Sequence, residues 1–402
     1  MKISPAPSGE NGLSVAIELN RFDRGGLEKV VLDTALSMRA RGIRVVVVSV
    51  EPIGQLGSLA VEAGIEVVRL PAFGRRLFYA ALLRRRGVNV AVAHNSRAGY
   101  PVFRALGIPC VAFIHNVNAM FHSSDLRRHL ADDRFVAHYI SVSNCATRYA
   151  VGKLGLDRRK ISTIPNGLIV EEHRRAEVTP ASVTRATLGL SDTDYVFLNL
   201  ASYNLHKGHF LMLRAMELIA ARRKDVKILC AGGEAVPRHV ARLRAEIARR
   251  GMGGFMLMPG RFDNAADLHR LSDAFLLPSF IEGWSIAMNE AMFHAKPMIL
   301  TDTGGAREVV VDGDIGIVVP NEYGDALNLD ARLLDELALS PRDYRTAPAL
   351  AEAMLQFADN RERWAAAGAL GRRKILEQHD FASIVDRHIE LLRAVADRGA
   401  SA

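Results

Sequence analysis

The chain has 402 residues, of which 49% are hydrophobic and 24% charged, and this composition excludes a disordered, collagen-like or long coiled-coil protein. Its three cysteines, Cys110, Cys145 and Cys230, lie too far apart in the sequence to suggest a disulfide framework or a cysteine zinc site, so we expect a reducing compartment. The net charge of +8 is concentrated in residues 1–175, which hold 25 Lys and Arg against 14 Asp and Glu and therefore favour an anionic partner.

The N-terminal residues 1–11 carry Pro, Ser, Gly and Glu where a secretion signal needs an apolar core. No apolar run approaches the roughly 20 residues that a membrane-spanning helix needs. We therefore expect a cytoplasmic protein. The basic first half makes the inner face of the plasma membrane a candidate surface for peripheral attachment.

Short β-branched runs alternate with helix-period segments through the first half of the chain. Several runs are apolar almost throughout, as expected of strands buried on both faces of a parallel sheet. Between the first two runs, residues 26–40 repeat apolar residues at helical spacing, and Arg41-Gly42 follow as a stop signal. This βαβ order predicts a doubly wound α/β sheet. The expected strands are Leu13–Leu19, Ile43–Val50, Ile65–Leu70, Val88–Ala93, Pro109–Ile114, Tyr139–Val142 and Ile161–Ile164.

The pattern breaks at the turn signal Pro165-Asn166-Gly167 and at the charged stretch Glu171–Glu177, and then it restarts. Helical segments such as Phe210–Arg223 and Val236–Arg250 separate a second set of strands, and Pro348–Arg398 is helical by composition and period. The sequence therefore predicts two similar α/β domains with a boundary near residues 165–185. The second set of strands is Tyr195–Ala201, Val226–Ala231, Phe255–Met258, Ala274–Pro278, Pro297–Thr301 and Gly316–Val319.

The most informative segment is residues 278–291, which follow a predicted strand, pass Gly283 and open a helix. A helix N-terminus after a glycine turn presents unpaired N–H groups and the positive end of a dipole, which suit a phosphate. Glu282 precedes the turn and Glu290 lies within the helix, so the two carboxylates suit a nucleotide-sugar, which has hydroxyls on both sides of its diphosphate. On spacing alone, an ordinary strand-to-helix connection with two solvated glutamates fits equally well.

Glu282 and Glu290, eight positions apart with Pro278-Ser279 upstream, resemble the E-x7-E signature of family 4 glycosyltransferases, which are retaining enzymes. Further motifs resemble those of the family in the same order, from about residue 12 to residue 320. They are Asp23-Arg24-Gly25-Gly26-Leu27-Glu28, Phe113-Ile114-His115-Asn116, Ile140-Ser141-Val142-Ser143, Ile164-Pro165-Asn166-Gly167, Lys207-Gly208, Ala231-Gly232-Gly233-Glu234 and Thr303-Gly304-Gly305-Ala306-Arg307-Glu308.

The resemblance implies a GT-B fold, in which two Rossmann-like doubly wound domains face an interdomain cleft. It places an acceptor-binding domain in residues 1–172 and a nucleotide-sugar-binding domain in residues 173–377. A C-terminal helix, at about residues 378–398, would cross back and pack on the first domain.

Roles also follow from the resemblance, residue by residue. Glu282 would hold hydroxyls of the donor sugar, and Glu290 the ribose hydroxyls, because a carboxylate accepts two O–H bonds. Lys207 would stabilise the diphosphate charge as the glycosidic bond breaks, without a metal. His115 would contact the transferred sugar. Gly283 and the backbone N–H groups of Trp284, Ser285 and Ile286 would contact the sugar and the diphosphate. Gly25 and Gly26 would lie against the donor phosphate or the acceptor. Arg261 and Phe262 would contact the nucleotide base.

One position departs from the family pattern. Ser202 stands where the family has an arginine, so one of two expected diphosphate cations is missing. Tyr203 or Asn204 would then supply hydrogen bonds, and Arg261 or Arg307 would supply charge. Trp284 fits either a sugar-stacking surface or the core.

Two Asp-x-Asp sequences, Asp192-Thr193-Asp194 and Asp312-Gly313-Asp314, match a spacing that binds metal in other glycosyltransferases. Both lie beside predicted strands, where aspartate is a common turn residue. The histidines lack an HExxH-like spacing. We therefore expect no metal and no other cofactor.

A basic and aromatic stretch runs from Phe73 to Arg86. Such a segment fits either a helix lying on anionic lipid or a solvated surface helix. The arginines are scattered over helices without an RNA- or DNA-binding motif, so we expect no nucleic acid partner.

The resulting prediction is a retaining hexosyltransferase that moves a sugar from a UDP- or GDP-sugar to a glycan or lipid-linked acceptor in bacterial polysaccharide or glycolipid synthesis. A front-face mechanism is expected, in which the leaving phosphate helps to deprotonate the acceptor. Two alternatives stay open: a nucleotide-sugar epimerase or hydrolase of the same fold, and a catalytically degenerate scaffold, for which Ser202 is the supporting feature.

Overall fold

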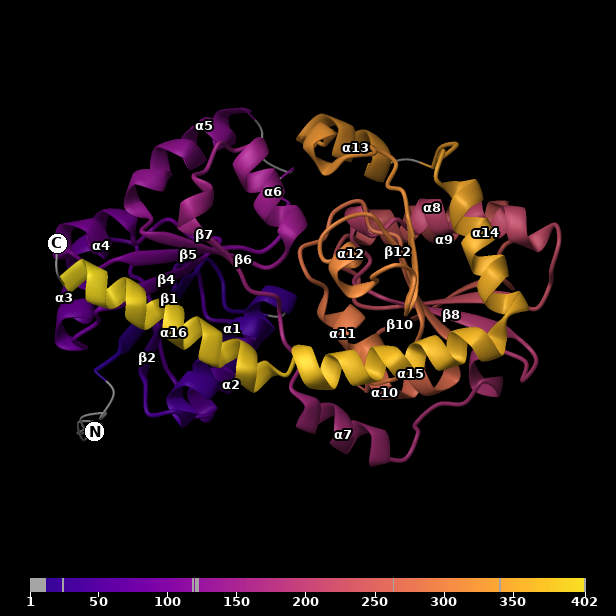
Figure 1. The fold of residues 1–402 in the computed structure, drawn as a ribbon, viewed down its shortest axis with the longest axis horizontal. Coiled ribbons are helices and arrows are strands. Elements are labelled where there is room, and N and C mark those ends of the chain that lie inside the picture. Colours follow the sequence, from indigo (N-terminus) through magenta and orange to yellow (C-terminus); the bar gives the residue numbers. More distant parts are fainter. Residues whose placement is uncertain are drawn as a thin grey trace.

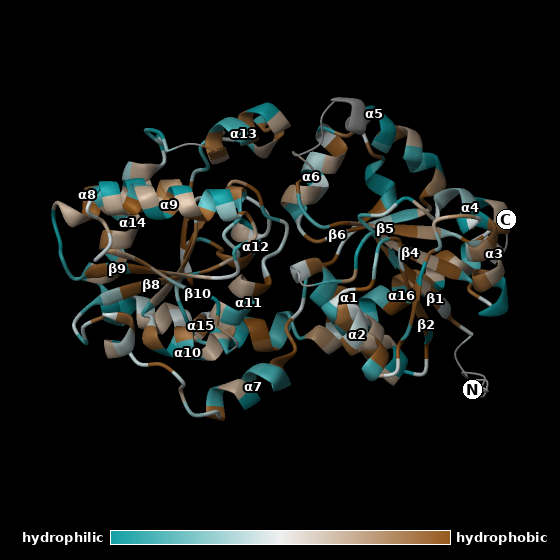
Figure 2. Cartoon of the chain, turned by 180° about the vertical axis from the view of Figure 1, so that it is seen from behind, coloured by the Kyte–Doolittle hydropathy of each residue, from teal (hydrophilic) through white to brown (hydrophobic). Residues whose placement is uncertain are grey.

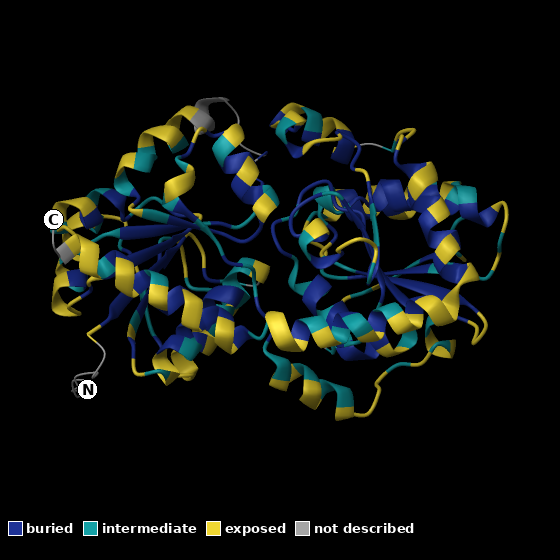
Figure 3. Cartoon of the chain, viewed as in Figure 1, coloured by how far each residue is buried: buried dark blue, intermediate teal, exposed yellow. Residues whose placement is uncertain are grey.

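A computed structural model describes residues 12–23, 25–117, 119, 123–262, 264–339 and 341–400. Figure 1 shows two α/β domains side by side, with two long C-terminal helices running along both. Each domain is built around one parallel sheet. Central strands are buried on both faces and the outer faces of the helices are exposed, as Figure 3 shows, which agrees with the apolar runs in the sequence.

The first sheet has seven parallel strands in the order β3-β2-β1-β4-β5-β6-β7. Its strands are β1 Ser14–Leu19, β2 Arg44–Ser49, β3 Glu66–Arg69, β4 Val90–His94, β5 Cys110–Ile114, β6 His138–Ser141 and β7 Ile161–Thr163. Its helices are α1 Gly26–Ala40, α2 Gln55–Glu62, α3 Arg75–Arg85, α4 Tyr100–Leu106, α5 Ser123–Asp132 and α6 Asn144–Gly152.

The second sheet has six parallel strands in the order β10-β9-β8-β11-β12-β13. Its strands are β8 Tyr195–Leu200, β9 Val226–Ala231, β10 Met256–Gly260, β11 Ala274–Leu277, β12 Met298–Thr301 and β13 Gly316–Val319. Its helices are α7 Val170–Val178, α8 His209–Ala220, α9 Pro237–Arg249, α10 Ala265–Leu271, α11 Ile286–Phe293, α12 Ala306–Val309, α13 Ala331–Leu339, α14 Ala347–Asp359 and α15 Arg361–Gln378. The last helix of the chain, α16, spans Phe381–Ala400.

Side-chain alternation along the strands divides each core into two layers. In β1, Val15 and Ile17 pack with α1 and α16, whereas Ala16 faces the opposite layer, where Tyr79 of α3 and Phe103 of α4 pack. Figure 2 shows hydrophobic strands surrounded by helices of mixed polarity. Central strands such as β1 and β4 are buried on both faces, so their sequences read as nearly continuous apolar runs, whereas the edge strand β3 is only partly buried.

Both sheets have a switch point, where neighbouring strands connect in opposite directions along the sheet. In the first sheet it lies between β1 and β4, and in the second between β8 and β11. Ligands of open parallel sheets bind at the carboxyl ends of the strands at such points. The loops after β1 and β8, and the loop after β11, carry Gly25, Lys207 and Glu282 respectively.

The chain crosses between the domains twice, and the two crossings are paired. The Leu168 backbone N–H donates to the His379 carbonyl at 2.9 Å, and the Phe381 N–H donates to the Leu168 carbonyl at 3.1 Å. Beyond this point α16 packs on the first sheet, where Ile384 and Val385 are buried in the same core as Val15. The charged stretch 171–177 is not a loop but lies within α7.

No helix of the described residues is long and apolar enough to cross a membrane.

Gly167 provides a test of the paired crossing. A Cβ atom at Gly167 would lie 2.7 Å from the Cα of Phe381, a backbone atom that cannot move aside cheaply. We expect Gly167→Ala to lower the free energy of unfolding by roughly 1–3 kcal/mol, as overpacking does elsewhere, measured by urea denaturation. Gly253→Ala is the matched control because no atom lies within 4 Å of its Cβ. If the two variants are equally stable, the segments at Gly167 and Phe381 can move apart without loss of stability, and their close contact is not needed for folding.

Candidate functional site

The two domains touch at Gly283, at the turn between β11 and α11. Asn116 of the first domain and Gly283 of the second form an antiparallel backbone bridge. A Cβ atom at Gly283 would lie 1.7 Å from the carbonyl oxygen of His115, so the approach requires glycine. The predicted histidine segment and the predicted glycine turn therefore meet, although 168 positions separate His115 from Gly283.

Lys207 and Glu282 form an ion pair at the switch point of the second sheet. The Lys207 Nζ lies 2.5 Å from Glu282 Oε1, and the Ser279 hydroxyl donates to the same oxygen at 2.9 Å. Gly208, at a φ of 72°, allows the lysine loop to press against strand β11, where a Cβ atom would lie 2.0 Å from the Pro278 carbonyl oxygen. The tight packing of these two loops brings the predicted lysine and carboxylate together.

Glu290 lies one turn into α11 and faces a cavity of about 260 Å³ between the domains. The cavity is also lined by Asn264 and Ala265 at the start of α10, and by Lys29 and Asp33 of α1. Burial raises the pKa of Glu290 to about 7, and the Lys29 charge acts in the opposite direction. A carboxyl group with such a pKa changes its charge near neutral pH.

Helix α1 contributes residues to this cavity that sequence reasoning missed. Lys29 Nζ lies 2.7 Å from Asp33 Oδ1 and 3.4 Å from Glu172 Oε2 of α7, so it ties the first domain to the second. Burial raises the pKa of Asp33 to about 6. The sequence signal for these residues is weak, because Lys29 and Asp33 read as an ordinary i,i+4 pair on a helix and Glu172 lies 143 positions from Lys29.

His115 belongs to a buried histidine cluster that the sequence did not reveal. Its Nε2 lies 2.8 Å from Nδ1 of His94, at the end of β4, and His388 of α16 packs against the neighbouring Phe113. Burial lowers the pKa of His115 to about 4 and that of His94 well below its ordinary value. His115 is therefore neutral at physiological pH. It can contact a sugar through its ring or carbonyl but cannot stabilise a developing anion as a cation.

Of the two residues expected to supply hydrogen bonds in place of the missing arginine, Tyr203 already uses its hydroxyl within the second domain, which leaves Asn204. The Tyr203 side chain is fully buried, and its hydroxyl donates to the Cys230 carbonyl at 2.6 Å. The glycine pair after β9 explains this placement, because Gly232 and Gly233 pack directly on the backbone of residues 201–203. The aromatic ring fills the space between the loop and the sheet.

Trp284 is part of the core rather than an open stacking surface. Its side chain is 5% exposed, and its indole N–H donates to Asn289 Oδ1 at 2.9 Å. The Asn289 side-chain amide donates to the Asn166 carbonyl, and the Asn166 amide donates to the Trp284 carbonyl, each at 2.9 Å. This network ties the Pro-Asn-Gly turn of the first domain to the start of α11.

The remaining predicted residues lie on loops around the site. Ser202 is exposed after β8, and Asn204 precedes the short 3₁₀ turn Leu205–Lys207. Arg261 is exposed after β10, whereas Phe262 packs against a small cluster that includes Leu268. Arg307, the other candidate cation, is exposed and pairs with Asp302 at 2.7 Å.

The helix start after Glu282 has no side-chain cap, and the hollow beside Glu282 and Ser285 measures only about 10 Å³, whereas the glycine loop of the first domain is exposed. Ser285 and Ile286 begin α11 without a side-chain cap. Gly25 and Gly26 are exposed at the start of α1, and a Cβ atom at Gly25 would lie 2.0 Å from a Glu28 carboxylate oxygen. Arg24, which belongs to the same predicted motif, lies outside the described residues.

In both Asp-x-Asp sequences, the second aspartate accepts a hydrogen bond from a nearby backbone N–H group. Asp194 Oδ2 accepts a hydrogen bond from the Ser191 N–H at 2.8 Å, and Asp314 Oδ1 accepts one from the Ile315 N–H at 2.7 Å. The second carboxylate oxygen of Asp314 bonds to Lys374. No group of three or more His, Cys, Asp or Glu side chains in the described part of the chain is arranged to hold a metal ion.

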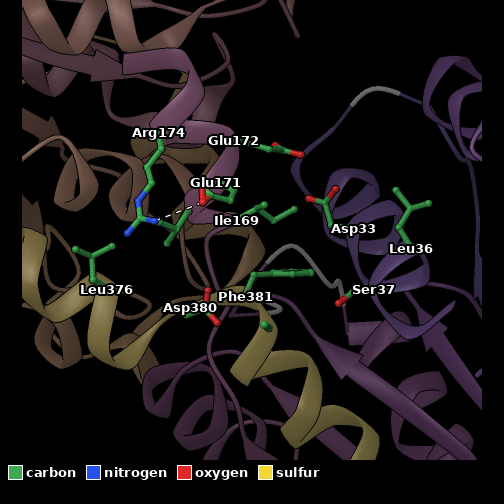
Figure 4. Close-up of a pocket in the computed structure, with 12 residues that line it drawn as sticks. Asp33, Leu36, Ser37, Ile169, Glu171, Glu172, Arg174, Leu376, Asp380 and Phe381 are labelled. Carbon is green, nitrogen blue, oxygen red and sulfur yellow. Dashed lines mark hydrogen bonds and ion pairs between the residues drawn. The ribbon is translucent and has the colours of Figure 1, made fainter. Parts of the chain in front are cut away.

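A larger cavity, of about 600 Å³, lies at the paired crossing rather than at the switch points. Figure 4 shows Phe381 and Asp380 of the second crossing on one side, with Asp33 of α1 and Glu172 of α7 facing them. It shares Asp33 and Glu172 with the Glu290 cavity, so the two hollows adjoin along the interdomain groove.

Two family descriptions match the chain, one for each domain. Residues 24–172 match "Glycosyltransferase Family 4" and residues 182–347 match "Glycosyl transferases group 1". Together the matches extend over both sheets and include His115, Lys207, Glu282 and Glu290.

Relatives with assigned names share about a quarter of their aligned residues with the chain. The alpha-maltose-1-phosphate synthase of Mycobacterium tuberculosis is 26% identical over 245 residues, 60% of this chain and 58% of that protein. The match therefore spans less than two thirds of that relative's length. A UDP-Gal:alpha-D-GlcNAc-diphosphoundecaprenol alpha-1,3-galactosyltransferase of Escherichia coli is 23% identical over 280 residues, 64% of this chain and 70% of the relative. The phosphatidyl-myo-inositol mannosyltransferase of Mycobacterium tuberculosis is 27% identical over 269 residues, 65% of this chain and 60% of the relative.

Solved structures reproduce the whole fold. Anabaena Alr3699/HepE in complex with UDP-glucose superimposes with a TM-score of 0.78 at 17% identity, over 95% of this chain and 100% of the other. WaaG, a glycosyltransferase of lipopolysaccharide biosynthesis, superimposes with a TM-score of 0.64 at 16% identity, over 94% and 99%. Both agree with the predicted GT-B arrangement of two Rossmann-like domains.

Proposed function

The chain belongs to the family 4 glycosyltransferases with the GT-B fold, and from this premise we propose that it transfers a sugar from a UDP- or GDP-sugar to a glycan or lipid-linked acceptor. The names of two relatives describe transfer to a diphosphoundecaprenol-linked sugar and to phosphatidyl-myo-inositol. A structural neighbour holds UDP-glucose. These names support a nucleotide-sugar donor and an acceptor used in bacterial polysaccharide or glycolipid synthesis.

The observation that carries the proposal is the pairing of Lys207 with Glu282 beside the uncapped start of α11. A diphosphate at this helix start would receive backbone N–H groups and the positive end of the helix dipole. It would also compete with Glu282 for Lys207. Once the lysine turns to the phosphate, the Glu282 carboxylate becomes free to accept hydrogen bonds from the donor sugar.

The ribose end of the donor fits the cavity at Glu290. A carboxylate accepts two hydroxyl hydrogen bonds, which matches the two ribose hydroxyls. Asn264 and Ala265 line the same cavity, and Arg261 and Phe262 lie three residues or fewer before Asn264, where the base would sit. The donor would then extend from the Glu290 cavity along the start of α11 to Glu282.

Chemistry would take place where His115 meets Gly283. As the glycosidic bond breaks, negative charge grows on the diphosphate, and Lys207 with the N–H groups of α11 would stabilise it in place of a metal. His115 is neutral, so it would orient the sugar rather than transfer a proton to the phosphate. We propose a front-face course with retention, in which the leaving phosphate takes the acceptor proton. Contact between the domains would exclude water that hydrolyses the donor.

Two alternative functions are compatible with the same fold but do not transfer a sugar to an acceptor. An epimerase or hydrolase would convert the donor without an acceptor, and a degenerate scaffold would bind ligands without turnover. Ser202 supports the scaffold because it removes one cation from the site. The close pairing of Lys207 and Glu282 supports an enzyme, because both groups are held where a diphosphate and a sugar would lie.

Lys207→Ala tests the electrostatic role. We expect kcat to fall by about 100- to 1,000-fold, as losing one donor to a developing oxyanion does, with a smaller change in KM for the donor. Steady-state release of nucleotide in the presence of acceptor measures both. Lys227→Ala, a lysine on β9 that bonds the Gly254 carbonyl, is the control and should keep wild-type rates.

A kcat for Lys207→Ala within about twofold of wild type would remove Lys207 from catalysis. NMR of the product separates the reaction classes: a new glycoside with the anomeric configuration of the donor supports retaining transfer, and free sugar or an epimer formed without acceptor supports the alternatives.

The raised pKa of Glu290 predicts a pH dependence of donor binding. The ionised carboxylate accepts both ribose hydroxyls, and protonation removes one acceptor, so affinity should fall as pH drops below about 7. The expected loss is at most about tenfold per pH unit. Calorimetric titration with UDP-glucose, and with GDP-mannose for the other donor class, measures it, since their diphosphates do not titrate near neutral pH.

Glu290→Gln should bind the same donor more weakly and lose this pH dependence, because its amide does not titrate. If the variant keeps the wild-type slope between about pH 6 and about pH 8, another group is responsible and Glu290 does not bind the ribose.

A further inference from the structure

We propose that a pocket of arginines in the first domain binds the phosphate or diphosphate of a lipid-linked acceptor. This arginine pocket is a cavity of about 510 Å³ lined by Arg75, Arg76, Arg97 and Arg128, with Tyr100 and Asp132. It is separate from the cavity at Glu290 and from the Lys207–Glu282 pair. The assignment rests on the proposed function, because it names the chemistry of the acceptor.

The pocket is assembled from three segments of the chain. Arg75 and Arg76 begin α3, Arg97 lies in the loop between β4 and α4, and Arg128 lies in α5. Strands β3 and β4 both end at this edge of the sheet, which is also the edge where β5 leads to His115. The pocket therefore lies at the same end of the strands as His115.

The charge of the pocket is strongly unbalanced. Asp132 Oδ2 lies 3.4 Å from Arg97. Among the side chains that the structure describes, which leave out those of residues 123–126, no ion pair joins a carboxylate to Arg75, Arg76 or Arg128. Arg75 donates instead to the Pro71 carbonyl at 3.3 Å. The guanidinium groups of Arg75, Arg76 and Arg128 therefore give the cavity an excess of positive charge, and a dianion between them would offset their mutual repulsion. Guanidinium groups bind phosphate oxygens in pairs, which makes phosphate the fitting anion.

A buried carboxylate supports the loop that carries Arg97. Glu18 of β1 is fully buried and lies against Gly99, where a Cβ atom would approach its Oε2 to 2.4 Å. Tyr79 of α3 packs edge-on against Phe103 of α4, with ring centroids 5.6 Å apart, and both are fully buried. These contacts pack α3 against α4, so Arg75 at the start of α3 and Arg97 before α4 line the same cavity.

Apolar side chains lie beside the arginines and indicate that the anion belongs to a lipid. Phe73 is 93% exposed, Leu77 is 81% exposed and Phe78 is 44% exposed, and all three lie within three residues of Arg75. Apolar side chains next to a basic pocket match a phosphate attached to a hydrocarbon chain. The structure thus places the aromatic and basic stretch, which the sequence left open between a lipid-facing and a solvated helix, beside a cavity of about 510 Å³ that Arg75 and Arg76 line.

The position of the pocket also bears on the length of the acceptor. Helices α3 and α4 lie at the end of the first domain that is remote from the second domain, as Figure 1 shows. Arg97 follows His94 by three residues, and His94 contacts His115. A phosphate in the pocket would be held apart from the reacting hydroxyl, which suits an acceptor with sugar units between its phosphate and its acceptor hydroxyl.

Vesicle binding tests the pocket without requiring sugar transfer. The probes are phosphatidylcholine vesicles with and without phosphatidic acid, whose phosphate is attached to lipid, and free inorganic pyrophosphate. The test variant is Arg76→Ala/Arg128→Ala, in which both positions are exposed, and the control is Arg84→Ala/Arg85→Ala, which removes the same charge from exposed positions on α3 outside the pocket. We expect the wild type to co-sediment with phosphatidic acid vesicles, and the test variant to bind them about tenfold or more weakly, with the control near wild type.

A third variant separates the two sources of phosphate. Phe73→Ser/Leu77→Ser should weaken vesicle binding and leave pyrophosphate binding unchanged. If pyrophosphate binds but vesicles do not, the lipid assignment is wrong. If the two arginine variants lose vesicle binding equally, or if neither probe binds the wild type, the pocket is not a phosphate site. A thermal shift with UDP in every variant would show that the donor site is intact, so failure of the pocket is distinguishable from failure of the proposed transferase.

Discussion

The contact between Gly283 and the His115 carbonyl is the constraint on which the rest of the site depends. It requires a residue without a side chain, and it brings the loop after β5 of the first sheet against the loop after β11 of the second. Asn166 and Asn289 reinforce it by tying the last turn of the first domain to the start of α11. The other residues proposed to bind the donor, Lys207, Glu282 and Glu290, lie on loops and a helix next to this contact.

Parallel sheet topology explains why the functional loops gather there. In each domain the chain reverses direction across the sheet between two central strands, which leaves a gap between their following loops. The first domain contributes its glycine loop and His115, and the second contributes Lys207, Glu282 and Glu290. The paired crossings at Leu168 and Phe381 hold the two edges face to face and let α16 complete the core of the first domain.

Strand positions and the main donor residues could be predicted from the sequence, because both depend on local patterns. Each expected strand agrees with an observed strand to within about two residues at its ends, as is usual for such boundaries, and α1 spans the predicted residues 26–40. Lys207 and Glu282, predicted from separate motifs, lie in contact.

What could not be predicted depends on burial and on contacts between distant segments. Tyr203 carries a hydroxyl in a motif loop, but its ring fills the space below that loop and its hydroxyl bonds to the sheet. Lys29 of α1 and His94 at the end of β4 reach the site only because the domains and strands are packed together. The arginine pocket combines three segments whose charges looked scattered in the sequence.

A crystal structure with an intact nucleotide-sugar would test the central claim most directly. The account predicts the diphosphate at the start of α11 with Lys207 turned from Glu282 toward it, the ribose at Glu290, and the sugar between Glu282 and His115. A nucleotide bound instead in the cavity at the paired crossing, with the Lys207–Glu282 pair still intact, would contradict it.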